Sequence, residues 1–419
     1  MNFYIIRLFI TVLGILFVDV ATVWGLKKTF PQFYCCHKRG ISTAFIIQSV
    51  LMVITFLIGG TTLHQFSDFQ LYAWHSYLGG LMSAIYIPKA FYVFLVVTDC
   101  IIAKITKLYR RQLDILPRNS RRIIAKFGFY ICIIFGSLIL WGILYGRNNF
   151  SIDQVEVFID DLPAAFHGYK IVQISDIHAG SFFTPSKRYQ KVVDLINGQQ
   201  PNIIVCTGDM VNNFAEEIIP LIPVFSQLDA PDGKYAILGN HDYSGYYDWD
   251  RRADSVANHN ILVNAIEQMG FKLLNNKAVT ISRYNNDRMA LIGVENWGWK
   301  RRHPKRADVE TAIKSVQNIP FKILLSHDPL YWQKEIEGKT DIVLTLSGHT
   351  HGMQAGIKFG KKRFSIASLL KFPYGAGLYQ TGQQYLYVNS GLGVIGFPGR
   401  IGMPPEITVL SLWKSKILD

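Results

Sequence analysis

The feature that most constrains this 419-residue chain is the concentration of long apolar runs in its first 150 residues. A bilayer-spanning helix needs roughly 20 mostly apolar residues. Four segments meet that length: Phe3–Gly25, Ile41–Leu63, Leu71–Ala103 and Ile123–Gly146. The third is too long for one span and too short for two, so we expect one tilted or protruding helix. Each segment could instead be a buried core helix. We predict a membrane domain at 1–150 with four transmembrane helices and a second domain at 151–419.

The formal net charge is +13, and the location of the excess Lys and Arg decides whether it indicates a nucleic-acid partner or a membrane topology. Residues 1–150 hold 15 Lys and Arg against 4 Asp and Glu, which leaves 28 against 26 in the remainder. The excess belongs to the membrane part, so no nucleic-acid partner is predicted. Lys and Arg crowd the first and third connections and are absent from the second, 64–70. The positive-inside rule then predicts a multi-pass plasma (inner) membrane protein with an extracytoplasmic C-terminal domain; five spans would reverse this.

The first apolar segment has an alternative interpretation as a cleaved signal peptide. Arg7 alone would form its basic end, and Asp19 interrupts the apolar run, so we favour a retained helix. The five cysteines show no metal-binding spacing. They also predict no disulfide within the second domain, since only Cys206 lies there.

From Lys170 onward, short apolar segments typical of strands each end in a cluster of polar residues. The clusters are Asp176-Ile177-His178, Thr207-Gly208-Asp209, Gly239-Asn240-His241-Asp242, Ser326-His327-Asp328-Pro329 and Ser347-Gly348-His349-Thr350-His351. The first three are spaced by 31 residues (His178 to Asp209 to Asn240), about the length of a βαβ unit. Because ligands gather at the carboxyl ends of strands in open α/β sheets, we expect these clusters to meet.

The clusters together offer oxygen and imidazole donors and no thiolate. Any one cluster is more often a simple turn. The full set suits two adjacent divalent ions such as Mn²⁺, Fe²⁺ or Zn²⁺ rather than a closed structural zinc site. The candidate metal ligands are Asp176, His178, Asp209, Asn240, His327, His349 and His351.

The motifs Asp-x-His, Gly-Asp, Gly-Asn-His-Asp, Ser-His and Gly-His-x-His, in this order, resemble those of the calcineurin-like metallophosphoesterases over about Lys170 to Leu412. The resemblance implies an α/β fold: a four-layer α/β/β/α sandwich of two mixed sheets, here following an N-terminal helical transmembrane region. It also implies that Asp176, His178 and His351 hold one metal, that Asn240, His327 and His349 hold the other, and that Asp209 bridges them. His241 would be catalytic beside a phosphate oxygen, with Asp242 orienting it.

The C-terminal stretch from Asn389 to Ile407 narrows this resemblance to the bacterial transmembrane or exported branch, which includes UDP-2,3-diacylglucosamine hydrolase-type members. Arg400 is a candidate to bind a substrate phosphate; alternatively it is a surface Arg that closes a Gly-rich turn. Two loops, Asn296–Arg306 and Met353–Tyr379, combine aromatic or apolar residues with cations as interfacial segments do, or are simply solvated basic loops.

The predicted activity is hydrolysis of phosphodiester or pyrophosphate bonds by a metal-held hydroxide. The expected substrates are envelope lipids or UDP-diacylglucosamine-like molecules, with membrane lipids as partners. One alternative is the same hydrolase acting on soluble nucleotides or cell-wall phosphates. The other is a non-catalytic membrane scaffold or sensor with a structural metal site.

Overall fold

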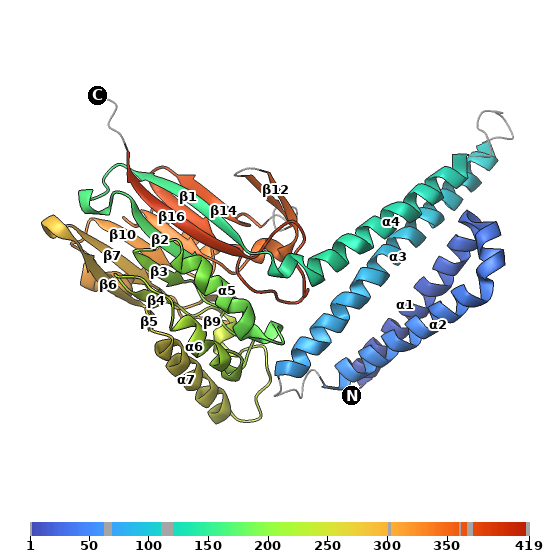
Figure 1. Cartoon of the computed structure of the whole chain (residues 1–419), viewed down its shortest axis with the longest axis horizontal. Helices are drawn as coiled ribbons and strands as arrows, with labels where there is room; N and C mark the ends of the chain where they lie inside the picture. Colours follow the sequence, from blue (N-terminus) through green and yellow to red (C-terminus); the bar gives the residue numbers. More distant parts are fainter. Residues whose placement is uncertain are drawn as a thin grey trace. The chain divides into compact units, whose positions relative to one another are not determined.

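The computed structural model describes residues 2–62, 69–109, 120–300, 303–359, 362–366 and 372–415 (Figure 1). The chain divides into two compact units. One contains most of the N-terminal helices and ends at Ile143, and the other continues from Leu144. The connections 63–68 and 110–119, which enter the charge argument, lie outside the described residues.

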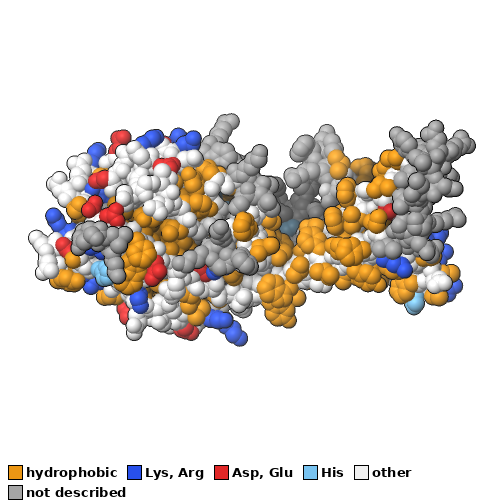
Figure 2. Space-filling model, turned by 90° about the horizontal axis from the view of Figure 1, so that it is seen from above, with side chains coloured by type: hydrophobic (Ala, Val, Ile, Leu, Met, Phe, Trp, Pro, Cys, Tyr) orange, Lys and Arg blue, Asp and Glu red, His pale blue; other side chains and the backbone are white. Residues whose placement is uncertain are grey.

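Four long helices form the N-terminal unit: α1 (Asn2–Thr29), α2 (Pro31–Thr62), α3 (Phe69–Tyr109) and α4 (Ser120–Leu144). In the described part of the chain, three stretches are long and apolar enough to cross a membrane: Phe9–Thr29, Gln70–Ile102 and Ile124–Asn148. On the face seen in Figure 2 this unit carries mainly hydrophobic side chains.

The predicted third segment is one helix, since α3 runs unbroken through Pro88. The predicted second span, Ile41–Leu63, falls in α2 but ends outside the described residues. The count of four spans therefore stays a prediction.

The second unit contains two six-stranded mixed sheets. The first has the order β1 (Ser151–Ile159), β16 (Glu406–Lys414), β2 (Tyr169–Ile174), β3 (Ile203–Cys206), β4 (Lys234–Ala236) and β5 (Phe271–Leu273). The second has the order β14 (Gly377–Thr381), β15 (Gln384–Val388), β11 (Leu344–Ser347), β10 (Phe321–Leu325), β7 (Arg288–Gly293) and β6 (Lys277–Ser282). Strands β2 to β5 are parallel, as are β7, β10, β11 and β15.

Helices cover the outer face of each sheet, which confirms the predicted four-layer sandwich. α5 (Pro185–Asn197), α6 (Ile222–Phe225) and α7 (Arg252–Gln268) pack on the first sheet, and α8 (Val309–Ile313) packs on the second. Neighbouring residues on one strand enter different cores: Val172 contributes to the core under α5, and Ile171 to the core between the sheets. Burial on both faces explains why these strands read as continuous apolar runs.

Two small hairpins complete the described structure: β8 (Trp297–Lys300) with β9 (His303–Lys305), and β12 (Gly356–Phe359) with β13 (Lys362–Ser365). Each directly follows or precedes a polar loop at a strand end of the second sheet. Both hairpins therefore extend from the edge where the predicted metal ligands lie.

Candidate active site

Five strand ends bring the predicted metal ligands into two groups. The loops after β2, β3, β4, β10 and β11 supply the side chains, and these strands are neighbours within their sheets. In the described part of the chain, Asp176, His178 and His351 form one group with ligand atoms within 4.8 Å of one another, and Asp209, His327 and His349 form a second. The clustering expected from the strand pattern is thus present in the fold.

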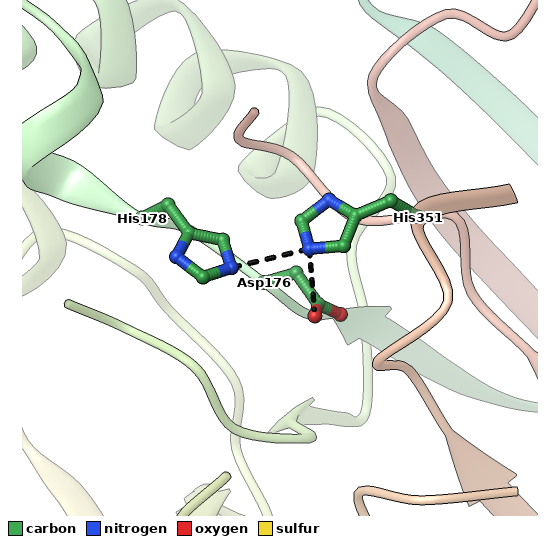
Figure 3. A group of neighbouring side chains, drawn as sticks. All are labelled: Asp176, His178 and His351. Atoms are coloured by element: carbon green, nitrogen blue, oxygen red, sulfur yellow. Dashed lines mark hydrogen bonds and ion pairs between the residues drawn. The ribbon is translucent and has the colours of Figure 1, made fainter. Parts of the chain in front are cut away.

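The first group is fully buried and brings its donor atoms together at one point (Figure 3). Nε2 of His351 lies 3.2 Å from an oxygen of Asp176 and 3.1 Å from Nε2 of His178. The backbone N–H of His349 donates to Asp176 at 3.0 Å, which ties this group to the loop of the second.

The second group is arranged around His327. Its Nε2 lies 3.1 Å from Oδ2 of Asp209 and 3.1 Å from Oδ1 of Asn240. Nδ1 of His349 is also 3.1 Å away. The same Oδ2 of Asp209 lies 3.8 Å from Nε2 of His178 in the first group. One carboxylate oxygen therefore faces both groups, which is the position that a bridging ligand needs.

The hydrogen bonds of two imidazoles orient them toward the metal groups. Nδ1 of His327 lies 2.7 Å from the carbonyl oxygen of Thr207 and donates to it, so Nε2 faces the group. Nδ1 of His178 lies 2.9 Å from Oδ1 of Asn212 and is fixed in the same way. Partners of this kind orient metal-binding histidines. Burial lowers the pKa of His327, but Asp209 and Asp176 outweigh it and raise this pKa to about 10, so a divalent cation would have to displace the proton from Nε2.

The electrostatics of the acidic ligands favour their charged forms. Burial alone would raise the pKa of Asp176, but His351 and His327 outweigh it and hold this pKa well below its ordinary value. His327 and His241 act on the pKa of Asp209 in the same way. Burial keeps the pKa of His178 low, with His241 and His351 adding to the effect. Ionised carboxylates and neutral imidazole are the states that bind metal.

The backbone at these ligands is unusual. Asp176, His178, Asp209, His349 and His351 all have positive φ, between 45° and 70°. Non-glycine residues rarely adopt this region, and such strain gathers at functional sites. The glycines of the motifs have a steric reason: a Cβ on Gly348 would come within 2.4 Å of Asp176 Oδ2, and one on Gly239 within 2.2 Å of Asp209 Oδ1.

Similarity to known proteins identifies the family to which this chain belongs. The family model described as calcineurin-like phosphoesterase matches residues 169–353. A Bacillus subtilis protein, "Uncharacterized metallophosphoesterase YkuE", is 34% identical over 257 residues, which is 60% of this chain and 81% of the relative. The chain belongs to the calcineurin-like phosphoesterases. As a family member with this set of metal-binding groups, it is a metal-dependent phosphoesterase.

Two further relatives have names that mention a substrate or a membrane location. The Chlamydia muridarum "UDP-2,3-diacylglucosamine pyrophosphatase LpxG" is 31% identical over 317 residues, which is 65% of this chain and 92% of the relative. The Danio rerio "Transmembrane protein with metallophosphoesterase domain" is 28% identical over 353 residues, which is 81% of this chain and 74% of the relative. This share of the chain is larger than the share that residues 151–419 make up, so the similarity extends into the N-terminal helices.

His241 lies at the rim of both groups of this phosphoesterase. Its ring is 4.9 Å from that of His178 and stacks at 4.3 Å on Tyr246. Its Nδ1 lies 2.8 Å from the carbonyl oxygen of Asn212 and donates to it, so Nε2 is the nitrogen free to meet a substrate. Burial lowers the pKa of His241 from its ordinary value. A neutral imidazole would have to gain a proton before it could donate one.

The contacts of the Asp242 carboxylate are with backbone N–H groups of the ligand loops. The buried carboxylate accepts backbone hydrogen bonds from Asp209 at 2.8 Å, Met210 at 2.8 Å and Gly239 at 2.9 Å. The carbonyl of Asn212, not this carboxylate, orients the His241 ring. Asp242 therefore holds two ligand loops together. The sequence motif indicates that the Asp242 carboxylate lies near the metal ligands, but it does not indicate which N–H groups donate hydrogen bonds to it.

The contacts of Arg400 favour its alternative interpretation as a residue that closes the Gly-rich turn. The guanidinium is fully buried and donates to the carbonyl oxygens of Gly393 at 2.7 Å and Ser390 at 2.8 Å. Its Nε also donates to Gly393, and its Nη1 faces two further carbonyls, of Met403 and Pro404. Arg400 thus contacts the C-terminal turn from inside the domain, where the alternative placed it at the surface.

Sequence reasoning missed Asn212 and Tyr246. Asn212 fixes His178 with its side chain and His241 with its carbonyl. Tyr246 stacks on His241 and accepts from Nδ2 of Asn240 at 2.9 Å. Asn212 lies three residues after Asp209 in the same strand-end loop, which was a usable signal. No sequence signal marked Tyr246, because it lies four residues after Asp242, outside the Gly-Asn-His-Asp motif.

A cavity of about 210 Å³ opens beside the second group. Asn240 and His349 form its metal-side wall, and Tyr246, Trp297 and Tyr374 contribute aromatic faces. Ligand sites commonly combine an apolar lining with a few polar groups. This cavity is the candidate place for the part of the substrate that extends from the phosphoryl group.

Proposed function

We propose that this membrane-anchored phosphoesterase hydrolyses phosphodiester or pyrophosphate bonds of lipid-linked substrates at a two-metal centre. The observation that carries the proposal is the placement of Asp209 Oδ2 between His327, at 3.1 Å, and His178, at 3.8 Å. One metal is assigned to Asp176, His178 and His351, and the other to Asn240, His327 and His349, with Asp209 shared. Mn²⁺, Fe²⁺ and Zn²⁺ suit this mixture of oxygen and imidazole donors.

Two divalent cations held there would supply Lewis acidity to water and to the scissile phosphoryl group. The chain's own residues supply the rest. Asn240 contributes a neutral oxygen, which adds no negative charge against the phosphate. His241, with Nδ1–H bonded to Asn212, presents Nε2 toward the reacting phosphate, where its protonated form would stabilise charge on the leaving oxygen.

The substrate class rests on two independent facts. The described part of the chain carries three candidate membrane spans. A relative whose sequence it covers over 92% of its length is named as a UDP-2,3-diacylglucosamine pyrophosphatase. A pyrophosphate joined to a lipid-bearing sugar is accordingly the favoured substrate. The proposed topology is four spans in the plasma (inner) membrane with the catalytic domain on the extracytoplasmic side.

The test uses the full-length protein in lipid nanodiscs with Mn²⁺. We expect hydrolysis of bis-p-nitrophenyl phosphate, reduced at least about 10³-fold in Asp209→Asn. Asp194→Asn, an exposed carboxylate on α5, is the matched control and should retain full activity. Near-normal hydrolysis by Asp209→Asn would refute the bridging assignment. Metal-loaded parent protein without any phosphoesterase activity would favour the scaffold alternative.

The substrate is tested by comparing UDP-2,3-diacylglucosamine in the nanodisc with UDP-glucose in solution. The proposal expects higher kcat/KM on the lipid-linked substrate. Equal or higher kcat/KM on the soluble compound would support the alternative of a soluble nucleotide substrate.

A further inference from the structure

The β12–β13 hairpin has two faces of opposite character. Ile357 pairs directly with Phe364, and Lys358 pairs with Arg363. Since directly opposed residues share a face and neighbours alternate, the two pairs point to opposite sides. Ile357 is 68% exposed and Phe364 is 62% exposed. Ile366, two residues beyond Phe364, extends the same outward side and is also exposed.

Two cations of the hairpin, Lys358 and Arg363, are turned inward. Nζ of Lys358 lies 2.6 Å from Asp153 on β1. Arg363 pairs with Asp153 and with the buried carboxylate of Glu406 on β16. The expectation that this loop presents its charges to lipid head groups is therefore wrong for these two residues. Lys361, Leu369 and Leu370 of the same loop lie outside the described residues.

The inward face also fixes the hairpin to the domain. A Cβ on Gly356 would come within 3.0 Å of Met403 and closer still to the backbone of Phe364, so glycine permits this packing. The N–H of Gly356 donates to Ile401 at 2.9 Å. Ion pairs and close packing thus hold the outward side, Ile357, Phe364 and Ile366, at a set position. An exposed apolar surface held in this way indicates a binding face.

The hairpin and its partner Asp153 are close in sequence to the metal ligands and to a candidate membrane span. β12 begins five residues after the candidate ligand His351. Asp153, which holds both cations, lies five residues after Asn148, the end of a candidate membrane span. Five extended residues reach at most about 18 Å. Phe372, itself exposed, lines the cavity beside Asn240 and His349.

We propose that the outward side of the hairpin inserts into the interfacial layer of the bilayer that the chain's own helices span. Apolar side chains gain free energy when they leave water for the headgroup and acyl boundary. The covalent tether makes the bilayer the surface with the highest effective concentration near the hairpin. This inference rests on the proposed function, and it explains how the cavity mouth is held where a lipid-linked pyrophosphate is presented.

The direct test is photocrosslinking, which needs no catalysis. Phe364 is replaced by p-benzoylphenylalanine in the full-length protein, reconstituted in nanodiscs of phosphatidylethanolamine and phosphatidylglycerol. Tyr284, an aromatic side chain of similar exposure (65%) on the β6–β7 turn, receives the same replacement as the matched control. We expect lipid adducts at 364 at least about fivefold above those at 284. Adducts that are absent at 364, or equal at the two positions, would overturn the proposal.

The functional test compares two substrates. The double variant Ile357→Ser/Phe364→Ser should lose about tenfold in kcat/KM on nanodisc-embedded UDP-2,3-diacylglucosamine and stay within about twofold of the parent on bis-p-nitrophenyl phosphate. The matched control is Val256→Ser/Ile261→Ser, two exposed aliphatic residues on α7. Equal losses on both substrates would contradict the insertion. If the parent hydrolyses neither substrate, the proposed function fails, and the crosslinking result still decides on the hairpin.

Discussion

Two of the buried polar clusters in the described part of the chain solve the problem of buried charge in opposite ways. In the catalytic unit, like atoms face one another: Nε2 of His178 and Nε2 of His351 are 3.1 Å apart beside Asp176. The acidic residues there are met by ring nitrogens of histidines. We expect divalent cations to complete this arrangement.

The cluster in the helical unit contains its own cation. Nζ of Lys89 on α3 lies 2.6 Å from Asp19 on α1 and 2.9 Å from Gln48 on α2. Asp19 also accepts hydrogen bonds from Ser49 at 2.5 Å and Tyr86 at 2.8 Å. Asp19 is midway along the candidate span Phe9–Thr29, where an unpaired charge would be most costly.

The metal-ligand groups are thus arranged to bind ions, whereas the Lys89–Asp19 cluster is arranged to hold helices together. Ligand atoms that converge in a buried place favour the binding of a metal ion. An ion pair that links three helices needs no ligand, and it fixes which faces of the helices pack together. Lys89 thus has its counter-ion on a neighbouring helix.

Removal of metal should separate the two clusters most strongly. Chelation should abolish hydrolysis and lower the stability of the catalytic unit, because a ligand at about 1,000 times its Kd stabilises by roughly 4 kcal/mol. The helical unit should keep its stability. Calorimetry of the full-length protein with and without Mn²⁺ reports both transitions. A shift of equal size in both units would contradict the distinction.

Loss of one charge should break the helical cluster. Lys89→Met leaves Asp19 buried without its partner, which typically costs about 3–5 kcal/mol. The helical unit should unfold at lower denaturant or temperature in nanodiscs, while hydrolysis of bis-p-nitrophenyl phosphate by intact protein stays near normal.

The double variant Asp19→Leu/Lys89→Met is the control for this prediction. It removes both charges, so most of the lost stability should return. A double variant as unstable as Lys89→Met would show that the pair is not what links these helices.

Much of the fold was predictable from the sequence because its signals are local. Val and Ile runs such as Ile203–Cys206 mark strands buried on both faces, and the 31-residue spacing marks βαβ units. The apolar lengths of α1, α3 and α4 mark candidate spans. The partners of long-range contacts carry no such signal, so the pairing of Lys89 with Asp19 across 70 residues could not be predicted.

The site was predictable as far as residue type and strand position determine it. Donors after parallel strands meet at one sheet edge, which placed Asp176 and Asp209 correctly beside histidines. The direction of a side chain in a loop depends on backbone φ and on which donors lie nearby. The backbone contacts of Asp242 and Arg400 could therefore not be predicted from their motifs.

A smaller effect is expected where a ligand is oriented rather than removed. Asn212→Ala takes away the acceptor that fixes Nδ1 of His178, and loss of such partners commonly costs 10- to 100-fold in metal affinity. Titration of the metal-stripped protein with Mn²⁺ measures this change directly. Asn197→Ala at the C-terminal end of α5, a half-buried residue outside the metal groups, is the control. Unchanged Mn²⁺ affinity in Asn212→Ala would show that His178 does not depend on this contact for its orientation.

The smallest effect should come from trimming the satisfied cluster without removing a charge. Ser49→Ala removes one of several hydrogen bonds that the Asp19 carboxylate accepts. Asp19 keeps Lys89 and Tyr86 as partners. Interhelical hydrogen bonds of this kind average only about 0.6 kcal/mol in membranes. Unfolding of the helical unit should therefore shift by an amount far below that of Lys89→Met. A loss as large as that of Lys89→Met would mean that Asp19 is not satisfied by its other partners, and the contrast between a self-sufficient cluster and a metal-demanding one would fall.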